Sequence, residues 1–463
     1  MAFAIISLKS ANNNPYFRLD ASLLEQHRIS NILKNLREHG LEFATLNELG
    51  FQVWNPPRMA MKKLRLSKTG LKTLFVGVGI AKKISINLSK IEIGYVPNEN
   101  YLISEGYILA PETGEPACGY VFEGAIDALH SYYDDKLPLA ATHNLFRITC
   151  ESCREELKGY IALLLNTSIG LSIIGFAKYG ALQPHYRADI LAKTPLPLLE
   201  RGKHCELLNK ALDHEAKAWR SYFKAMKIVE EYLNVRDIGL TSISSLKIMK
   251  DIGRIDATMH ILLSGIISRL GRGNIHYINK LYDVISGTAP SSRKYERPCK
   301  GQKYISTKSI DESGYIDEES FYCYPGELRT RNLAKRSSLV VLKNAHTVEA
   351  LGKMGIVYPY DNMPAISDLY ILNLKHNIEN DVSFYIIALS KTKFFKHMIQ
   401  SLAYGLTAHI KAEDLARVPI PFINQWKNVA RCMKEFVENM YQANALKRQA
   451  IAELENYILE LVS

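Results

Sequence analysis

The residues best suited to chemistry in this chain are lysines and arginines gathered in three short stretches. The chain has 463 residues, with 58 Lys and Arg against 47 Asp and Glu and a formal net charge of +11. The net positive charge of the three stretches together exceeds the net charge of the whole chain, so the remainder is slightly acidic. Clustered cations neutralise phosphate groups, which predicts binding to a polyanion such as double-stranded DNA. The candidate contacts are Arg58, Lys62, Lys63, Arg65, Lys68 and Lys72, then Arg293, Lys294, Tyr295, Arg297, Lys300 and Lys303, and finally Arg329, Arg331, Lys335 and Arg336.

Two short motifs could instead form a site for methyl transfer. Residues 55–58, Asn-Pro-Pro-Arg, are similar to the Asn-Pro-Pro-aromatic loop of adenine-specific DNA methyltransferases, and residues 75–79, Phe-Val-Gly-Val-Gly, are similar to their glycine turn for the adenosyl cofactor. However, Arg58 replaces the aromatic residue that stacks on a flipped base. Too few residues also separate the motifs to build the strands and helices that both sites need. A strand with a glycine bend is the competing interpretation of residues 75–79.

Other catalytic or metal sites have little support in the sequence. Asp135 with Glu156 and Lys158 is similar to the D…E-x-K metal site of nucleases, but such triplets arise often by chance, and the residues before Lys158 have the polar composition of a loop. Cys150 and Cys153 form a CxxC without the second pair that a zinc site needs. We expect reduced thiols in a cytoplasmic protein, no metal site and no catalytic residue.

The elements that must position the basic stretches occur twice in the chain. YIALLLNTSIGLSIIGFAKYGALQPHYRADILAKTPLP at 160–197 lines up with YIIALSKTKFFKHMIQSLAYGLTAHIKAEDLARVPIP at 385–421. Near the start of each copy, IISLKS and RLDA within 5–21 return as ISSLKI and RIDA within 243–257. Each copy is expected to contain a leading helix, strands rich in Val, Ile, Tyr and Gly, a second helix, and a Pro-x-Pro that breaks structure.

The duplication places basic stretches at corresponding positions in the two copies. The leading helices are expected at about 21–39 and 256–271, and the first two basic stretches follow them at corresponding places. This recurrence favours phosphate binding over ordinary solvated loops.

Residues 160–177 are uncharged over a length that could cross a bilayer, but the matching segment carries charged or titratable side chains, namely Lys391, Lys393, Lys396 and His397. Since both copies should share one environment, buried amphipathic helices are expected rather than membrane spans.

A heptad pattern follows each Pro-x-Pro. Apolar residues recur at 208, 212, 219, 222, 226, 229 and 233, interrupted only by Glu215, and again at 426, 429, 433, 436, 440 and 443 with a continuation to 461. The pattern predicts two helices on the order of 40 to 55 Å long that pair with each other. The alternative is that each helix packs on its own domain. The large apolar residues that we select as candidates for docking partner subunits are Trp219, Tyr222, Met226, Trp426, Met433 and Phe436.

On these features the chain resembles the specificity subunit of type I restriction-modification enzymes over essentially its full length. The resemblance is carried by RLDA and RIDA, by KGQKYISTKSI at 300–310, and by ADILAKTPLP and AEDLARVPIP before long helices. Their duplicated order is more specific than any one motif. The usual Glu-Gln after each module is missing, and the central glycine turn is only approximate at 112–114 and 351–353. A divergent relative with one degenerate module, or a type II or other defence-system protein, is also compatible.

The resemblance implies an α+β fold with two tandem target-recognition domains, mixed α/β and strand-rich, separated by two long helices that pair as an antiparallel coiled coil. The expected boundaries are 1–199 and 238–423 for the recognition domains, with helical spacers at 200–237 and 424–463. Each domain would read one half of a bipartite DNA target, and the helices would set the spacing.

The resemblance further implies DNA methyltransferase subunits and a restriction or translocase subunit as partners. S-adenosylmethionine, ATP and Mg would then be on those subunits, with no cofactor in this chain and no membrane association. Two other hypotheses stay open. One is a stand-alone adenine-specific DNA methyltransferase that uses residues 55–58 and 75–79, and the other is a helical scaffold that does not bind DNA.

Overall fold

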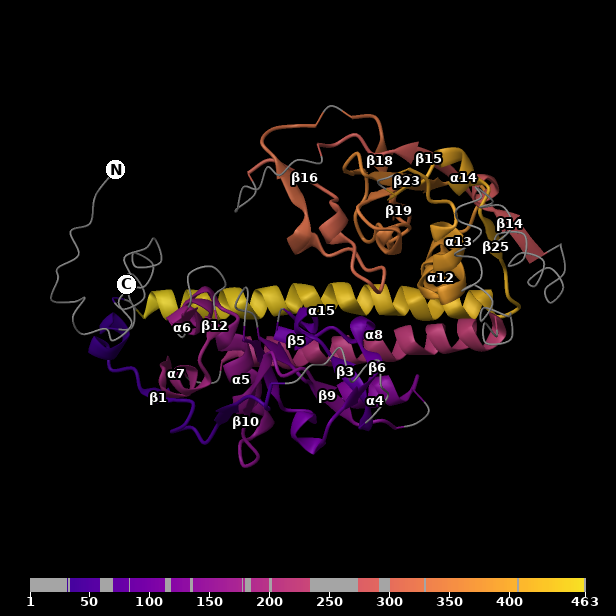
Figure 1. Cartoon of the computed structure of the whole chain (residues 1–463). Helices are drawn as coiled ribbons and strands as arrows, with labels where there is room; N and C mark the ends of the chain where they lie inside the picture. The colour runs from indigo at the N-terminus through magenta and orange to yellow at the C-terminus, as the bar shows by residue number, and fades with distance from the viewer. Residues whose placement is uncertain are drawn as a thin grey trace. The chain divides into compact units, whose positions relative to one another are not determined.

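The structure is a computed structural model that describes residues 31, 34–58, 70–82, 84–112, 118–133, 136–176, 178–179, 185–199, 202–233, 274–290, 300–328, 330–405 and 408–461 (Figure 1). The chain divides into two compact units. The first contains residues up to Ile126 together with Leu137–Asp213 and Ala443–Ser463, and the second contains Asp127–Lys136 and His214–Gln442. Both units combine helices with sheets, which confirms the expected α+β class.

The first unit is built around a six-stranded sheet. In spatial order its strands are β2 (Gln52–Trp54), β10 (Leu145–Thr149), β7 (Ile108–Pro111), β8 (Gly119–Tyr120), β5 (Ile84–Ile86) and β4 (Ala81–Lys82). The other strands are β6 (Glu92–Val96), β3 (Leu71–Val76) and β9 (Leu139–Ala141) in a three-stranded sheet, and the pairs β1 (Phe43–Thr45) with β13 (Pro195–Pro197) and β11 (Lys178–Tyr179) with β12 (His185–Tyr186). Short 3-10 helices lie at Val78–Ile80 (η1), Leu88–Lys90 (η2) and Glu99–Tyr101 (η3).

The second unit is built around a four-stranded antiparallel sheet. In spatial order its strands are β15 (Tyr282–Ser286), β23 (Leu369–Leu374), β19 (Leu339–Leu342) and β21 (Met354–Ile356). The pairs are β14 (Ile275–Tyr277) with β25 (Pro419–Pro421), β16 (Gln302–Tyr304) with β17 (Tyr322–Tyr324), β18 (Leu333–Ala334) with β22 (Met363–Pro364), and β20 (Asn344–Ala345) with β24 (Ala408–His409). The 3-10 helices are η6 (Thr307–Ser309), η7 (Glu318–Ser320) and η8 (Val348–Ala350). A buried cluster with Tyr304, Val340 and Ile371 forms the core between the sheet and the β16 segment.

The sheets of the two copies share one topology, which confirms the repeat. The order β2-β10-β7-β8 in the first copy matches β15-β23-β19-β21 in the second. In both, the first strand of the sheet pairs with the last strand before the helices. The registers also agree, since Leu145 lies opposite Pro111 in the first copy and Leu369 lies opposite Leu342 in the second.

The helices that follow the sheets are also duplicated. They are α5 (Glu155–Leu165), α6 (Ser168–Phe176) and α7 (Ala188–Lys193) in the first copy, and α12 (Asp381–Lys391), α13 (Lys393–Gln400) and α14 (Ala412–Ala416) in the second. The short helices α4 (Ala125–His130) and α11 (Ile278–Leu281) have no such counterparts among the described helices. Between the two longer helices of each copy, a threonine hydroxyl accepts from a backbone amide, at 3.0 Å for Thr167 and Gly170 and at 3.2 Å for Thr392 and Phe395. The long apolar run is thus two helices, and none of the described helices is long and apolar enough to span a membrane.

The Pro-x-Pro segments are strands, so the expectation that they break structure is wrong. Pro195–Pro197 pairs with β1, and Pro419–Pro421 pairs with β14, in two-stranded antiparallel sheets. Such edge positions tolerate proline because its missing N–H need not join a ladder on both sides. The central residues, Leu196 and Ile420, are buried. Each copy is therefore closed by a strand pair between its own first and last described strands.

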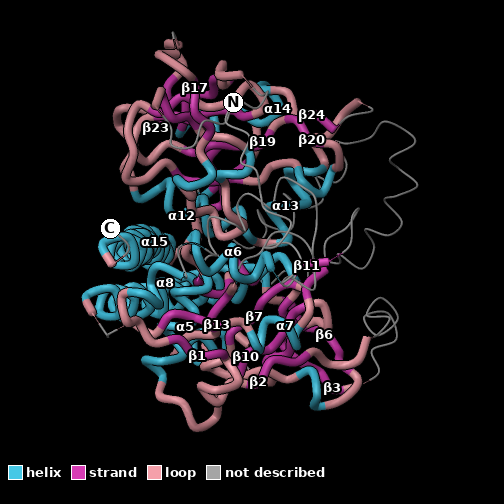
Figure 2. The backbone as a smooth tube through the Cα atoms, turned by 90° about the vertical axis from the view of Figure 1, so that its left-hand side faces the viewer, coloured by secondary structure: helices cyan, strands magenta, loops and turns pink. Residues whose placement is uncertain are grey.

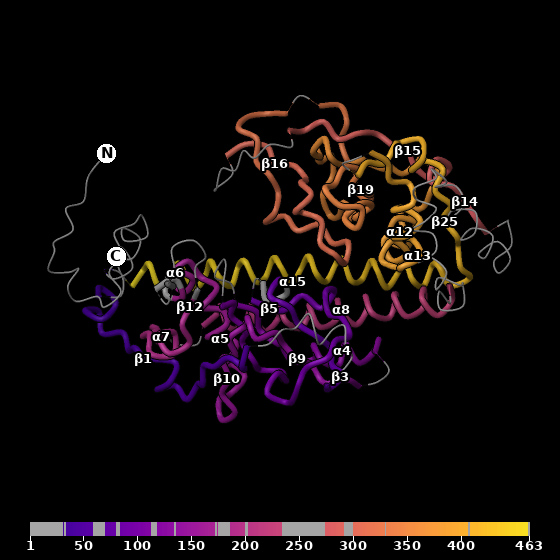
Figure 3. The backbone as a smooth tube through the Cα atoms, in the orientation of Figure 1, coloured from indigo at the N-terminus to yellow at the C-terminus, as the bar shows by residue number. Residues whose placement is uncertain are grey.

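The two heptad segments form single long helices, α8 (Lys203–Leu233) and α15 (Trp426–Glu460), which pair in antiparallel orientation (Figures 1 and 2). In the first unit, Lys203 forms an ion pair of 2.7 Å with Glu453. In the second, Trp219 packs on Phe436 with ring centroids 5.3 Å apart. Both helices run through both units, whereas the boundaries expected from the sequence treated them as separate spacers (Figure 3).

The burial of the heptad residues corrects the candidate docking surface. Trp219, Tyr222, Met226, Met433 and Phe436 are at most 7% exposed. Tyr222 and Trp219 both contact the ring of Phe436 in the second unit. Because these five side chains fill the chain's own interior, the prediction that they form a surface for partner subunits is wrong. Trp426 is half-buried against Tyr385 and Phe422 and stays a candidate.

Smaller predictions from the sequence have mixed outcomes in the structure. Residues 75–79 are the end of β3 followed by η1, which confirms the strand with a glycine bend. A glycine turn is present at Gly352, where φ is +73°. Cys150 and Cys153 form a disulfide, so the expectation of reduced thiols is wrong for this pair. The RLDA and RIDA segments and the second leading helix lie outside the described residues.

Candidate nucleic-acid interface

The basic stretches are connected to the same end of the two equivalent sheets. In the first copy, β2 ends at Trp54 beside the start of β10 and the end of β7, and the first stretch follows directly. In the second copy, β15 ends at Ser286 beside the start of β23, where β19 also ends. The second stretch begins a few residues after Ser286. The chain thus leaves both sheets for its basic stretches at one end, called here the recognition end.

At the recognition end of the first copy, an exposed cation is held by a buried anion. Arg58 Nη2 donates to Glu112 Oε1 at 2.6 Å, and the side chains are 71% and 9% exposed respectively. The backbone of Glu112 is fixed on both sides, because its N–H donates to Asn144 O at 2.7 Å and its carbonyl accepts from Tyr186 N at 2.9 Å. The loop before Arg58 is also anchored, since Tyr101 Oη donates to the Pro57 carbonyl at 2.6 Å.

Two buried polar atoms at this end of the sheet have no hydrogen-bond partner among the described residues. They are Asn55 Oδ1, in the residue after β2, and His143 Nδ1, in the turn before β10. Burial lowers the pKa of His143, and Arg58 and Arg147 lower it further while Glu112 opposes them. The imidazole is therefore neutral near pH 7. Unsatisfied buried polar groups are uncommon in proteins, so these atoms are available to water or a ligand.

The adjacent Arg147 is structural and does not add to the interface. It is fully buried and donates to the carbonyls of Thr142 at 2.9 Å and Ala141 at 2.6 Å, with its guanidinium over the Trp54 ring at 5.6 Å. Burial lowers the pKa of this guanidinium to about 10, so it remains charged at neutral pH. Its role is to tie the turn before β10 to the sheet.

In the second copy, the fold brings two basic stretches together around one strand. Strand β22 pairs with β18 in the third stretch, and the Pro364 carbonyl accepts from Ile305 N at 2.8 Å, directly after β16 in the second stretch. Both stretches therefore lie on either side of β22. The cations there are exposed, and none forms an ion pair with another described residue: Lys300, Lys303, Arg331, Lys335 and Arg336.

Neutral hydrogen bonds hold the third stretch in place. Leu328 N donates to Gln302 Oε1 at 2.6 Å, which joins this stretch to β16. Asn332 Nδ2 donates to the Ser286 carbonyl at 2.8 Å, which joins it to the end of β15. Arg336 lies over the ring of Tyr358 at 4.9 Å. Because these contacts leave Arg331, Lys335 and Arg336 without an ion pair among the described residues, these cations remain available to phosphate groups.

Lys343, which belongs to the third basic stretch but is not among the candidate contacts, lies at the recognition end of the second copy. Lys343 Nζ donates to Ser286 Oγ at 3.1 Å and lies over the Tyr370 ring at 4.7 Å. Burial lowers the pKa of this half-buried lysine, and the nearby Asp368 opposes that shift. Lys343 closes the third basic stretch, but charge pattern alone could not separate it from the other lysines. Glu112 and His143 gave no charge or motif signal for binding.

The remaining DNA-binding candidates either lie in another sheet or fall outside the described residues. Lys72 is half-buried on β3, where its backbone pairs with Tyr95 of β6, in a different sheet from β2. The first basic stretch therefore does not follow one sheet. The candidates that lie outside the described residues are Lys62, Lys63, Arg65, Lys68, Arg293, Lys294, Tyr295, Arg297 and Arg329.

The two methyltransferase-like motifs are attached to strands of different sheets. Residues 55–58 follow β2, and residues 75–79 end β3 in another sheet, in which one neighbour is parallel and the other antiparallel. Glu156 and Lys158 lie on α5, so the loop expected there is wrong, and Lys158 pairs with Glu155 at 2.6 Å. Asp135 lies outside the described residues. Within the described ranges, no group of three His, Cys, Asp or Glu side chains could hold a metal ion.

Comparison with solved structures found proteins of type I restriction-modification systems that are similar to this chain. No family model and no curated protein matches it. A type I restriction-modification S subunit from M. genitalium is 9% identical, with a TM-score of 0.34 and coverage of 91% of this chain and 96% of that one. An HsdS subunit from Thermoanaerobacter tengcongensis is 13% identical, with a TM-score of 0.25 and coverage of 91% and 95%.

A third structure, described as the structural basis of complex assembly and conformational transition of the type I R-M system, is 14% identical, with a TM-score of 0.27 and coverage of 91% and 96%. These TM-scores are below 0.5. The function of the chain is therefore inferred from its own duplicated sheets and charges.

Proposed function

We propose that this chain is the DNA sequence-recognition subunit of a restriction-modification complex. The observation that carries the proposal is that both copies direct a basic stretch from the same end of an equivalent sheet. A single basic loop would be an ordinary solvated surface, but the same charge at the same topological position twice favours a common ligand with two sites. Double-stranded DNA has the regular negative charge that such a pair of sites requires.

The copies would read different sequences, so the target would be bipartite and asymmetric. The recognition end of the first copy carries Asn55, Arg58 and Glu112, whereas that of the second carries Ser286 and Lys343. Unlike donors and acceptors at equivalent positions select unlike base edges in the major groove. The paired helices α8 and α15 would keep the two sites at a fixed separation, because a long helix pair is stiff along its axis.

Methyl transfer and cleavage would belong to separate subunits in the cytoplasm. The proposed partners are DNA methyltransferase subunits, which bind S-adenosylmethionine, and a restriction or translocase subunit, which uses ATP and Mg. The chain itself would be non-catalytic. Because the buried heptad residues join α8 to α15, the partners would dock on other faces of these helices, with Trp426 as the remaining candidate.

The test is to express the chain together with a candidate methyltransferase gene sought among its neighbouring genes and to map methylated adenines in the host DNA. We expect methylation at a two-part motif with a fixed spacer, and none when either gene is omitted. The absence of both a complex and a two-part motif would contradict the proposal. Methylation by this chain alone, with bound S-adenosylmethionine, would identify a self-contained methyltransferase instead.

A charge-reversal experiment separates DNA recognition from a purely helical scaffold. Lys303→Glu with Lys335→Glu should weaken binding to duplexes of any sequence and reduce the salt dependence of the affinity, by a slope of about 0.9 for each phosphate that is no longer neutralised. The control is Lys375→Glu, at the opposite end of β23, whose native ammonium donates to the Asn279 carbonyl at 2.6 Å. Unchanged methylation and binding in the double variant would favour the scaffold.

A further inference from the structure

Glu112 and Lys343 occupy equivalent backbone positions in the two copies. Each is the first residue after its strand, β7 or β19, at the recognition end. The N–H of Glu112 donates to Asn144 O at 2.7 Å, and the N–H of Lys343 donates to Asp368 O at 3.0 Å. Both accepting carbonyls belong to the residue just before the central strand, β10 or β23.

The second backbone contact is duplicated as well. The Glu112 carbonyl accepts from Tyr186 N at 2.9 Å, and the Lys343 carbonyl accepts from Ile410 N at 3.0 Å. Tyr186 and Ile410 are themselves matching residues of the repeat, just before α7 and α14. The fold therefore fixes the same position in both copies and leaves its side chain to differ.

The two side chains differ in sign, yet each recognition end presents one positioned cation. The carboxylate of Glu112 is 9% exposed and holds the 71% exposed Arg58 guanidinium at 2.6 Å. In the second copy, the ammonium of Lys343 is held by Ser286 Oγ at 3.1 Å and by the Tyr370 ring. A cation that is anchored before binding loses less side-chain freedom when a ligand arrives, and its geometry can discriminate between ligands.

We propose that Arg58 and Lys343 each contact a guanine edge in the major groove, and that Glu112 is a positioning residue for Arg58. This inference rests on the proposed function and names the groups that read bases in each half. A guanidinium or an ammonium pairs with the N7 and O6 acceptors of guanine, and arginine does so with two parallel hydrogen bonds. Glu112 binds one terminal nitrogen of Arg58 and is itself too buried to reach a base.

The experiment selects duplexes from a pool of randomised double-stranded DNA with the full chain, purified with any subunits that accompany it. Arg58→Lys keeps the charge but loses the two-pronged geometry, so it should relax preference at one base pair of one half-site by about 5- to 100-fold. Glu112→Gln should relax the same base pair less. Lys343→Gln should relax one base pair of the other half-site and leave the first half unchanged.

Matched controls lie at the opposite ends of the same central strands. One control is Arg154→Lys, because Arg154 is an exposed residue between β10 and α5. The other is Lys375→Gln, because Lys375 is the first residue after β23. Both should leave the selected sequence unchanged. The double variant Arg58→Lys with Glu112→Gln should be no more relaxed than Arg58→Lys alone, because Glu112 acts only through Arg58. If Glu112→Gln fails to fold, Glu112→Asp tests the same dependence.

The outcomes separate this inference from the proposed function. Enrichment of the wild-type sequence by Arg58→Lys and Lys343→Gln would overturn the inference while leaving DNA recognition intact. An even loss of affinity for every duplex, with a smaller salt dependence, would show phosphate contacts and would also overturn it. If the wild-type protein enriches no sequence, the proposed function fails and the base contacts fail with it.

Discussion

The hydroxyl of Tyr160 on α5 donates a hydrogen bond of 2.8 Å to the carbonyl of Pro197, the last residue of β13. The second copy repeats this contact between Tyr385 on α12 and Pro421 on β25. In each copy the bond joins the helix after the sheet to the strand that closes the copy. The same tyrosine, accepting carbonyl and strand thus recur in both halves of the chain, far apart in sequence.

Replacing these tyrosines should destabilise each copy and leave the surface intact. Tyr160→Phe should lower the free energy of unfolding by about 0.5 to 1.5 kcal/mol, because it removes one hydrogen bond of a buried carbonyl. Tyr385→Phe should cost a similar amount, because the Tyr385 hydroxyl also accepts from Ile423 N at 3.4 Å and the Tyr160 hydroxyl has the matching backbone hydrogen bond with Leu199. Chemical denaturation measures both. Tyr457→Phe at a 36% exposed position is the control, and an equal loss there would contradict the prediction.

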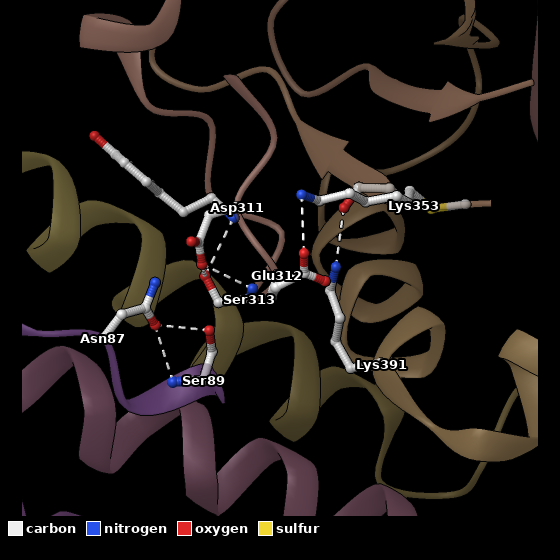
Figure 4. A network of polar contacts seen from close by, with 9 residues as sticks. Asn87, Ser89, Asp311, Glu312, Ser313, Lys353 and Lys391 are labelled. Atoms are coloured by element: carbon white, nitrogen blue, oxygen red, sulfur yellow. Dashed lines mark hydrogen bonds and ion pairs between the residues drawn. The ribbon is translucent and has the colours of Figure 1, made fainter. Parts of the chain in front are cut away.

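Lys391 should make stability depend on pH. Its ammonium donates to the Met354 carbonyl at 2.9 Å, beside the ion pair of Glu312 with Lys353 (Figure 4). Burial lowers the pKa of Lys391 from 10.5 to about 7. Between these values the unfolded chain binds a proton that the folded chain does not, so stability should rise with pH across this window.

Lys391→Met should remove that part of the pH dependence. The urea midpoint is measured for wild type and variant below the folded-state pKa and again well above it. The difference between the two proteins should shift in favour of wild type as pH rises, because the wild-type penalty for a buried charge disappears. A difference that stays constant with pH would contradict this. Lys353→Met, whose side chain is 25% exposed, controls for the removal of a neighbouring lysine.

Arg147→Met should strongly destabilise the first unit. The variant removes guanidinium donors from the carbonyls of Ala141, Leu145 and Thr142, of which the Thr142 carbonyl keeps a bond from Leu145 N at 3.2 Å. Losses of about 1 to 3 kcal/mol for each unsatisfied group predict more than about 2 kcal/mol in total. Thermal unfolding measures the effect. The exposed Arg154→Met should change stability by less than about 0.5 kcal/mol.

Trp219→Ala should impair assembly by destabilising the chain and not by removing a docking residue. Trp219 is 1% exposed and packs on Phe436, so its truncation should cost about 3 to 5 kcal/mol. Trp426→Ala, at a half-buried position, should instead reduce co-purification of a partner at nearly unchanged stability. Unfolding curves measured beside pull-down yields separate the two effects. Equal stability of Trp219→Ala and wild type would contradict the burial argument.

Sequence reasoning found the elements whose signal is local or repeated. The heptads predicted α8 and α15 because apolar residues recur along each helix at the spacing that fits pairing with another helix. The duplicated landmarks, including Tyr160 and Tyr385, predicted two copies with one order of elements. The Pro-x-Pro segments were misread because their pairing strands lie about 150 residues away in the sequence, and proline composition alone indicates a break.

The site could be predicted only in part. Charge runs pointed to Arg58 and to the cations around β22, since a polyanion contact needs little more than local charge. Glu112 was missed, and Lys343 was counted in the third basic stretch without being selected as a contact, because the equivalence of the two positions depends on where strand ends meet in space. The same limit explains why the heptad residues were predicted to dock partner subunits. Large apolar side chains fit a subunit interface and an intramolecular core equally well until their neighbours are known.

The strand pairs β1 with β13 and β14 with β25 have a consequence for evolution. Because the entry and exit strands of each copy lie side by side, each copy is a closed cassette whose two junctions with the rest of the chain are neighbours. Recombination between genes could then replace a whole cassette without changing the backbone path on either side. The same closeness makes new termini between these strands tolerable, so a circularly permuted chain that opens there should still fold.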